Sequence, residues 1–86
     1  MSVEQYQQAL LTSFNSSQDS AVQGAAQTAN HYTELFKTGQ ISRDEYVALM
    51  DDIAKTNNIN KNMDNMEIME HMNVAINGLI NLATLV

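Results

Sequence analysis

The segment TGQISRDE, from Thr38 to Glu45, contains a helix stop followed directly by a helix start. Gly39 suits the position just after a helix, where φ is positive and a side chain is disfavoured. Ser42 and Glu45 have the S-x-x-E spacing of a capping box, in which each side chain accepts a hydrogen bond from the other residue's backbone N–H. These signals predict two helices joined by a short and well-defined turn.

Apolar residues on both sides of this turn recur at the helical period. They predict one helix over residues 18–38 and a second over residues 43–56. Ile41 and Tyr46 stand just before and four positions into the second helix, which is the spacing of a hydrophobic staple. The turn and its flanks therefore predict an antiparallel helical hairpin.

The same period predicts two further helices, over residues 3–14 and 61–85. Polar stretches rich in Ser and Asn, at residues 12–20 and 56–60, have poor helix propensity and are expected to form loops. The dipeptide NG at 77–78 is a turn signal, but the apolar period runs through it. The last helix therefore either ends near this dipeptide or continues through it, and the apolar period favours continuation.

The fold class follows as all-α: a small bundle of three to four helices in one domain over residues 1–86. The chain has no Pro and three Gly, so few residues oppose helices. Ordering each residue costs about 1.5 kcal/mol, and each well-buried large side chain returns about 1.5–3 kcal/mol. Because these terms nearly cancel in a chain this short, we expect oligomerisation to complete the core.

Two apolar faces are the expected helix–helix contacts, one on each of the two longest predicted helices. Their spacing places the members of each set on one side of a helix. The expected interaction residues are Val22, Ala25, Ala29, Tyr32 and Phe36 on the first face, and Met69, Met72, Ile76, Leu79 and Ile80 on the second.

Charge and composition exclude several classes of partner. Ten acidic and four basic residues give a net charge of −6, which disfavours binding to a nucleic-acid backbone. The helix after the turn carries Asp44, Glu45, Asp51 and Asp52, so it is unsuited to reading DNA. The most apolar stretch, residues 72–86, has 15 residues against about 20 needed to span a bilayer. We expect neither nucleic acid nor membrane as a partner.

The Met-rich run MDNMEIMEHM, residues 63–72, is the most conspicuous chemical motif. Thioether sulfurs together with His71 would suit Cu(I), a soft metal. Met side chains at three-residue spacing diverge around a helix, however, and a flexible apolar stripe is the favoured interpretation.

Other catalytic and metal motifs are missing from the sequence. It contains no HExxH, no Glu-x-x-His pair of the di-iron type, no EF-hand loop, no G-x-S-x-G and no P-loop. The Ser residues lie in the predicted loop or at the predicted cap. We therefore predict a protein without catalytic residues, without a cofactor and without a metal site.

The stretch YTELFKTGQISRDEYVALMDDI, residues 32–53, resembles the short helical hairpin called the SHOCT (short C-terminal) domain. The matching positions are Leu35, Gly39, Ile41, Ser42, Glu45 and Tyr46. The resemblance implies a module that mediates oligomerisation. It covers about a quarter of the chain and is internal here, which departs from the family's terminal placement.

The overall composition is similar to that of small accessory proteins of tailed bacteriophages, since Asn and Gln make up 17 of 86 residues in an acidic chain without Cys. This resemblance implies a non-enzymatic virion component or assembly factor that acts through helix–helix contacts with a protein partner or with itself. It would be located in the virion or in the host cytoplasm. The alternative is a small acidic regulatory or inhibitory protein that binds a basic host or partner protein.

Overall fold

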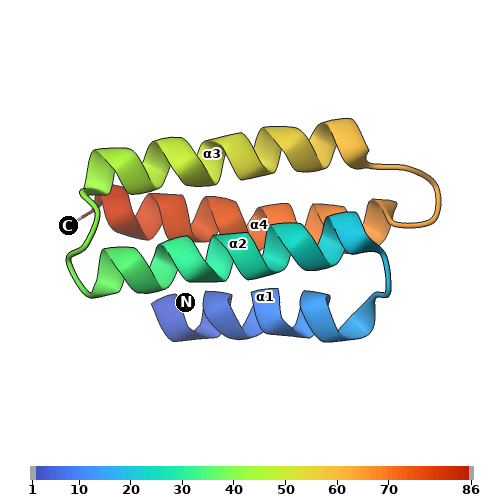
Figure 1. Ribbon diagram of the computed structural model, residues 1–86, viewed down its shortest axis with the longest axis horizontal. Helices are drawn as coiled ribbons and strands as arrows, with labels where there is room; N and C mark the ends of the chain where they lie inside the picture. Colours follow the sequence, from blue (N-terminus) through green and yellow to red (C-terminus); the bar gives the residue numbers. More distant parts are fainter. Residues whose placement is uncertain (1, 86) are drawn as a thin grey trace.

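Four α-helices alternate in direction in the computed structural model, which describes residues 2–85 (Figure 1). Their bounds are α1 Val3–Ser16, α2 Ser20–Lys37, α3 Arg43–Asn60 and α4 Met66–Thr84. Each helix contacts the next one in the chain, and α4 returns to contact α1. Across the bundle α2 also touches α4. The predicted all-α bundle is confirmed, with four helices in the described part.

The predicted turn between α2 and α3 is confirmed in detail. Gly39 has a φ of 77°, and the N–H of Gln40 donates to the Leu35 carbonyl at 2.8 Å, as in a Schellman motif. Ser42 Oγ accepts from the Glu45 N–H at 3.1 Å, while Glu45 Oε1 accepts from the Ser42 N–H at 3.4 Å. These local bonds fix where α2 ends and where α3 begins.

Tyr46 holds the hairpin together on its inner side. Its side chain is buried, its hydroxyl lies 2.7 Å from Thr33 Oγ1, and its ring stacks on Phe36 with centroids 4.6 Å apart. Ile41 packs against the same core, as expected of the apolar residue that precedes the cap. Burial raises the pKa of the Tyr46 hydroxyl, which stays neutral and hydrogen-bonded.

The loop between α3 and α4 lies later in the chain than predicted. α3 continues to Asn60 instead of ending near residue 56, and α4 starts at Met66 instead of residue 61. A tertiary hydrogen bond explains the longer α3, because Asn57 is buried and its Nδ2 donates to Asn73 Oδ1 at 2.8 Å. This bond outweighs the low helix propensity of the Asn-rich stretch.

Asn side chains build the actual loop, residues 61–65. Asn62 Oδ1 accepts from the backbone N–H groups of Asp64 and Asn65 at 2.9 and 3.0 Å. Asn65 Oδ1 accepts from the Asn62 N–H at 2.8 Å in return. This reciprocal Asx turn takes the place of helix in residues 61–65. The end of α1 lies closer to its prediction than the ends of α3 and α4 do: α1 ends at Ser16, and we expected residue 14.

One chain closes its own core. Among residues 2–85, thirteen apolar side chains are buried, and they come from all four helices. The accessible surface of 5145 Å² is close to the roughly 5,100 Å² expected for a folded monomer of this mass. The radius of gyration of 12.0 Å likewise matches the value of about 12 Å for a compact domain of this length. The described residues thus form a folded core within one chain, and oligomerisation stays a prediction.

α4 runs without interruption through the NG dipeptide, and Gly78 has a packing role there. A Cβ at this position would overlap the ring of Tyr6, which lies directly over the Gly78 backbone. The glycine thus allows α1 and α4 to approach closely at this point. No helix in the described part is long and apolar enough to cross a membrane.

We expect Gly78→Ala to give no gain in stability, although alanine favours a helix by about 1 kcal/mol over glycine. The new methyl group would displace the Tyr6 ring from its contact. Gly24→Ala is the matched control, since a Cβ on Gly24 of α2 meets nothing within 4 Å and the full gain should appear. Urea denaturation of both variants, alone and with Tyr6→Ala, measures the coupling. Equal gains from Gly78→Ala and Gly24→Ala would contradict the packing role.

A candidate docking groove between α2 and α3

Most of the predicted interaction residues are core residues of the same chain. Their side chains are at most 2% exposed, so they hold the bundle together. These residues are Val22, Ala29, Met69, Met72, Ile76 and Leu79. In this structure they make helix–helix contacts within one chain, and a contact with another molecule stays a prediction. The helical period identifies the apolar side of each helix, and that side is covered by the other helices.

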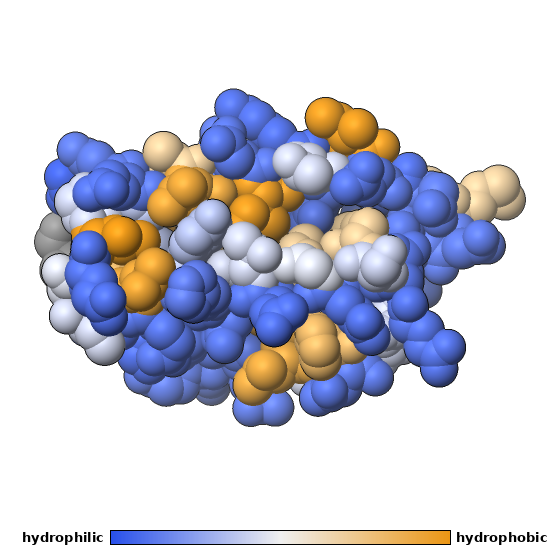
Figure 2. All heavy atoms as spheres, viewed as in Figure 1, coloured by the Kyte–Doolittle hydropathy of each residue, from blue (hydrophilic) through white to orange (hydrophobic). Residues whose placement is uncertain are grey.

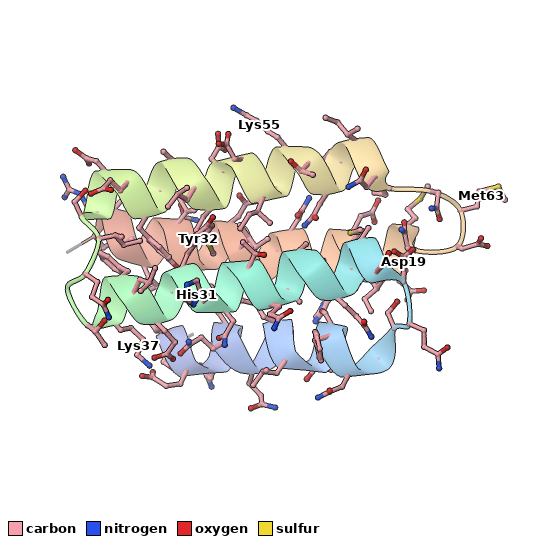
Figure 3. The ribbon with its side chains drawn as sticks, viewed as in Figure 1. Asp19, His31, Tyr32, Lys37, Lys55 and Met63 are labelled. Atoms are coloured by element: carbon pink, nitrogen blue, oxygen red, sulfur yellow. The ribbon has the colours of Figure 1, made fainter. Side chains whose placement is uncertain are left out.

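The other four predicted residues lie at the surface of the core. Phe36 is partly buried and stacks on Tyr46, and Ile80 is partly buried beside α3. Ala25 and Tyr32 line a groove between α2 and α3. Figure 3 shows Tyr32 in the seam between these two helices. Ile80 and Phe36 also line hollows, at the α3–α4 side and near the α2–α3 turn, so all four of these residues keep some surface open.

The groove follows two antiparallel helical segments of equal length, residues 21–32 of α2 and residues 49–60 of α3. At 1.5 Å of rise per residue each segment is about 16 Å long, or three helical turns. Figure 2 shows apolar atoms along this seam, bordered by hydrophilic atoms on both helices. The groove is thus an elongated depression with an apolar strip along it.

Apart from Tyr32 at one end, small residues form the α2 side of the groove: Ala21, Gly24, Ala25 and Thr28. Gly24 stands in the middle of a helix, where glycine costs about 1 kcal/mol relative to alanine. Nothing in the described part of the chain requires this glycine, because a Cβ there would point into open space. The α2 side therefore offers a flat surface that another backbone can approach closely.

The two ends of the groove differ in chemistry. Tyr32, Leu49 and Ile53 line one end and are all partly buried, so each keeps some apolar surface exposed. The other end is lined by Thr56, Asn57 and Asn60. A molecule in the groove would meet an apolar end and an end that offers hydrogen bonds.

Asn57 supplies a hydrogen-bond acceptor at this polar end. Its Nδ2 donates to Asn73 Oδ1, but no hydrogen bond within residues 2–85 is donated to its Oδ1. No buried polar side-chain atom of the described chain is without a partner, so this oxygen must reach solvent. Asn57 is 1% exposed and is among the residues that line the groove.

Asp52 is the one charged residue among the described residues that line the groove. Its neighbour Asp51 pairs with Lys55 at 2.8 Å, whereas Asp52 forms no salt bridge within 4 Å in residues 2–85. The pKa of Lys55 is raised, first by its hydrogen bond to Asp51 and only weakly by the charge of Asp52. Asp52 thus makes no ion pair among residues 2–85, although its charge acts on Lys55.

A separate polar network joins α1 to α2 on another side of the bundle. Gln7 Nε2 donates to Asn30 Oδ1 at 2.9 Å and to Glu34 Oε1 at 2.8 Å, while Lys37 Nζ donates to Gln7 Oε1 at 3.1 Å. The bond from Gln7 and the charge of Lys37 lower the pKa of the Glu34 carboxyl. Because these groups satisfy one another, the network is structural.

Asp19 connects the two loops at one end of the bundle (Figure 3). It is the N-cap of α2, where its Oδ1 accepts from the Ala21 N–H at 2.8 Å. Its Oδ2 accepts from Asn65 Nδ2, in the α3–α4 loop, at 3.0 Å. The bond from Asn65 and those from the backbone lower the pKa of the Asp19 carboxyl below its usual 3.8.

A depressed carboxyl pKa stabilises the folded state above the unfolded pKa, and this contribution is lost as the pH falls through the folded value. We therefore expect Asp19→Asn to lower the melting temperature at pH 7, although Asn is also a good N-cap. The difference from wild type should vanish at a pH below the lowered pKa of Asp19. Circular-dichroism melts across this range test the point. A difference that persists in acid would show that the charge is not responsible.

The Met-rich run does not form a cluster. Met63 is 94% exposed at the tip of the α3–α4 loop and points away from the bundle, whereas Met69 and Met72 are buried (Figure 3). Their sulfurs therefore lie in different environments. Among residues 2–85, no group of three or more His, Asp or Glu side chains is placed to hold a metal ion.

The groove contains residues that the sequence did not single out, above all Gly24, Asp52 and Asn57. Of these three residues, Gly24 alone could have been noticed in the sequence, because glycine is unfavourable inside an Ala-rich helix. Asp52 and Asn57 become noticeable only when α3 is placed beside α2 and α4. Their roles depend on tertiary contacts that helical periodicity does not contain.

Comparisons of this chain with protein-family models, with curated proteins and with solved structures give no match. The SHOCT resemblance of residues 32–53 thus stays a prediction that rests on the capped hairpin.

Proposed function

We propose that this protein is a non-enzymatic binding protein that acts through helix–helix contacts at the α2–α3 groove. The observation that carries the proposal is the groove itself. It combines exposed surface of Tyr32, Leu49 and Ile53 with the small residues of α2 and with an unpaired carboxylate, Asp52. The thirteen buried apolar side chains of the described residues, in contrast, are covered by the bundle's own helices.

The setting that we propose is a bacteriophage particle or its assembly in the host cytoplasm. The support for it is the resemblance in composition: a short acidic chain, without Cys and rich in Asn and Gln. A small helical bundle with a binding groove suits a virion component or an assembly factor, which needs to position another protein but not to transform it.

The second candidate is an acidic regulatory or inhibitory protein. The net charge of −6 and the unpaired Asp52 favour a basic target protein, since complementary charge speeds encounter and fixes orientation. Both candidates use the same groove. They differ in the identity of the bound protein.

Site-specific photo-crosslinking tests the proposal in cells that carry the gene. A photoreactive amino acid at Thr28, which is exposed in the groove, should crosslink to one specific protein. The matched control places it at Gln8, which is exposed on α1 away from the groove. A capsid or tail protein captured from Thr28 supports the first candidate, and a host regulatory protein supports the second. Equal crosslinking from both positions, or none, would contradict the proposal.

A further inference from the structure

We propose that the groove receives a basic amphipathic helix of a partner protein, about three turns long. This inference rests on the proposed binding function and names the chemistry of the partner. Apolar side chains of that helix would contact Tyr32, Leu49 and Ile53, while a Lys or Arg would reach Asp52 and the side-chain oxygen of Asn57.

The shape of the groove matches a helix. Residues 21–32 and 49–60 form the two long sides of the groove, each about 16 Å long. A segment of roughly eleven helical residues would span this length. Packed helices lie about 8–10 Å apart, and the shortest separations require small residues at the contact. Ala21, Gly24 and Ala25 meet this requirement, and close approach by a partner gives Gly24 a purpose that the bundle alone does not.

The polar groups of the groove select donors and positive charge. Asp52 carries the only charge among the described lining residues, and Asn57 presents an acceptor oxygen without a donor. An unpaired acceptor becomes costly once a partner excludes water from it, so the partner must supply an N–H group there. A Lys or Arg side chain provides such a donor together with the charge that complements Asp52.

The same charges disfavour a second copy of this chain as the occupant. Two copies would bring together two molecules of net charge −6, and each groove would present Asp52 to an acidic surface. Like charges placed opposite one another oppose association, while a basic helix is attracted. A partner of opposite charge is therefore the occupant that the groove favours.

Selection of displayed random peptides on the full-length protein tests this inference. Enriched peptides should place Leu, Ile, Met or Phe at i, i+3 or i+4 and i+7, and should carry Lys or Arg. Gly24→Leu, which fills the groove from a position with open space around it, should weaken their binding more than about tenfold. Gln8→Leu, which adds the same side chain on the exposed face of α1, should leave binding unchanged.

Asp52→Asn tests the electrostatic part separately. This variant should bind the enriched basic peptides more weakly than wild type and with less dependence on salt concentration. Circular dichroism checks that each variant keeps its helices. Enriched peptides that are acidic, or that bind the Gly24→Leu variant as tightly as wild type, would overturn the inference yet leave a binding function elsewhere. The absence of any enriched peptide would count against both the inference and the proposed function.

Discussion

A chain that ends at Asn65 should fail to fold cooperatively. It lacks α4, which provides six of the thirteen buried apolar side chains. Four of these six are large, and burial of each contributes about 1.5–3 kcal/mol, or roughly 6–12 kcal/mol together. Small domains are stable by only about 5–15 kcal/mol, so the loss is comparable with the total. Circular dichroism and urea denaturation of the shortened chain measure this outcome.

Two point variants of α4 separate the loss of core from the loss of chain length. Ile76 is fully buried and Val74 is 66% exposed on the same helix. Ile76→Ala should cost about 2–5 kcal/mol, while Val74→Ala should change stability by less than about 0.5 kcal/mol. A shortened chain that keeps its helices and a sharp unfolding transition, or equal costs for the two variants, would show that α4 does not complete the core.

The second large effect concerns the turn between α2 and α3. Loss of the Ser42 cap costs about 0.5–2 kcal/mol, and forcing a side chain into the left-handed region adds roughly 1–2 kcal/mol. The double variant Ser42→Ala with Gly39→Val should therefore lose about 1.5–4 kcal/mol in chemical denaturation. A Cβ on Gly39 meets no atom within 4 Å, so the penalty comes from the backbone, whose φ is 77°.

Gly24→Ala is again the matched control for this glycine. Gly24 lies inside α2, so the same loss of glycine freedom should stabilise the protein by about 0.5–1 kcal/mol. The two glycine substitutions should therefore have opposite signs. An unchanged denaturation midpoint in the double variant would mean that the capped turn contributes nothing to the fold.

This turn could be predicted in full because its signals are local. Gly39, Ser42 and Glu45 act within eight residues of one another: the glycine through its positive φ, and the other two through hydrogen bonds to the nearby backbone. The ends of α3 and α4 could not be predicted in the same way. They depend on the Asn57–Asn73 bond and on the Asn62–Asn65 turn, which override the low helix propensity of Asn.

The candidate site was predicted only in part, for a different reason. Periodicity correctly placed Val22 and Ile76 on apolar faces, but it does not distinguish a helix of the same chain from a helix of a partner. Ala25 and Tyr32 proved accessible because α3 and α4 leave this edge of α2 uncovered. Which atom of the Asn57 amide is left without a partner depends on the hydrogen bond from its Nδ2 to Asn73, and this bond forms only in the folded bundle.

Thiol labelling of two adjacent positions tests most directly whether one chain closes its core and leaves the α2–α3 groove open. The protein has no Cys, so Thr28→Cys and Ala29→Cys each introduce a single reporter. Thr28 is exposed in the groove and Ala29 is fully buried. Thr28→Cys should react as fast as in the unfolded chain, and Ala29→Cys only through unfolding, at every protein concentration. Equal rates, or protection of Thr28→Cys that grows with protein concentration, would contradict this structure.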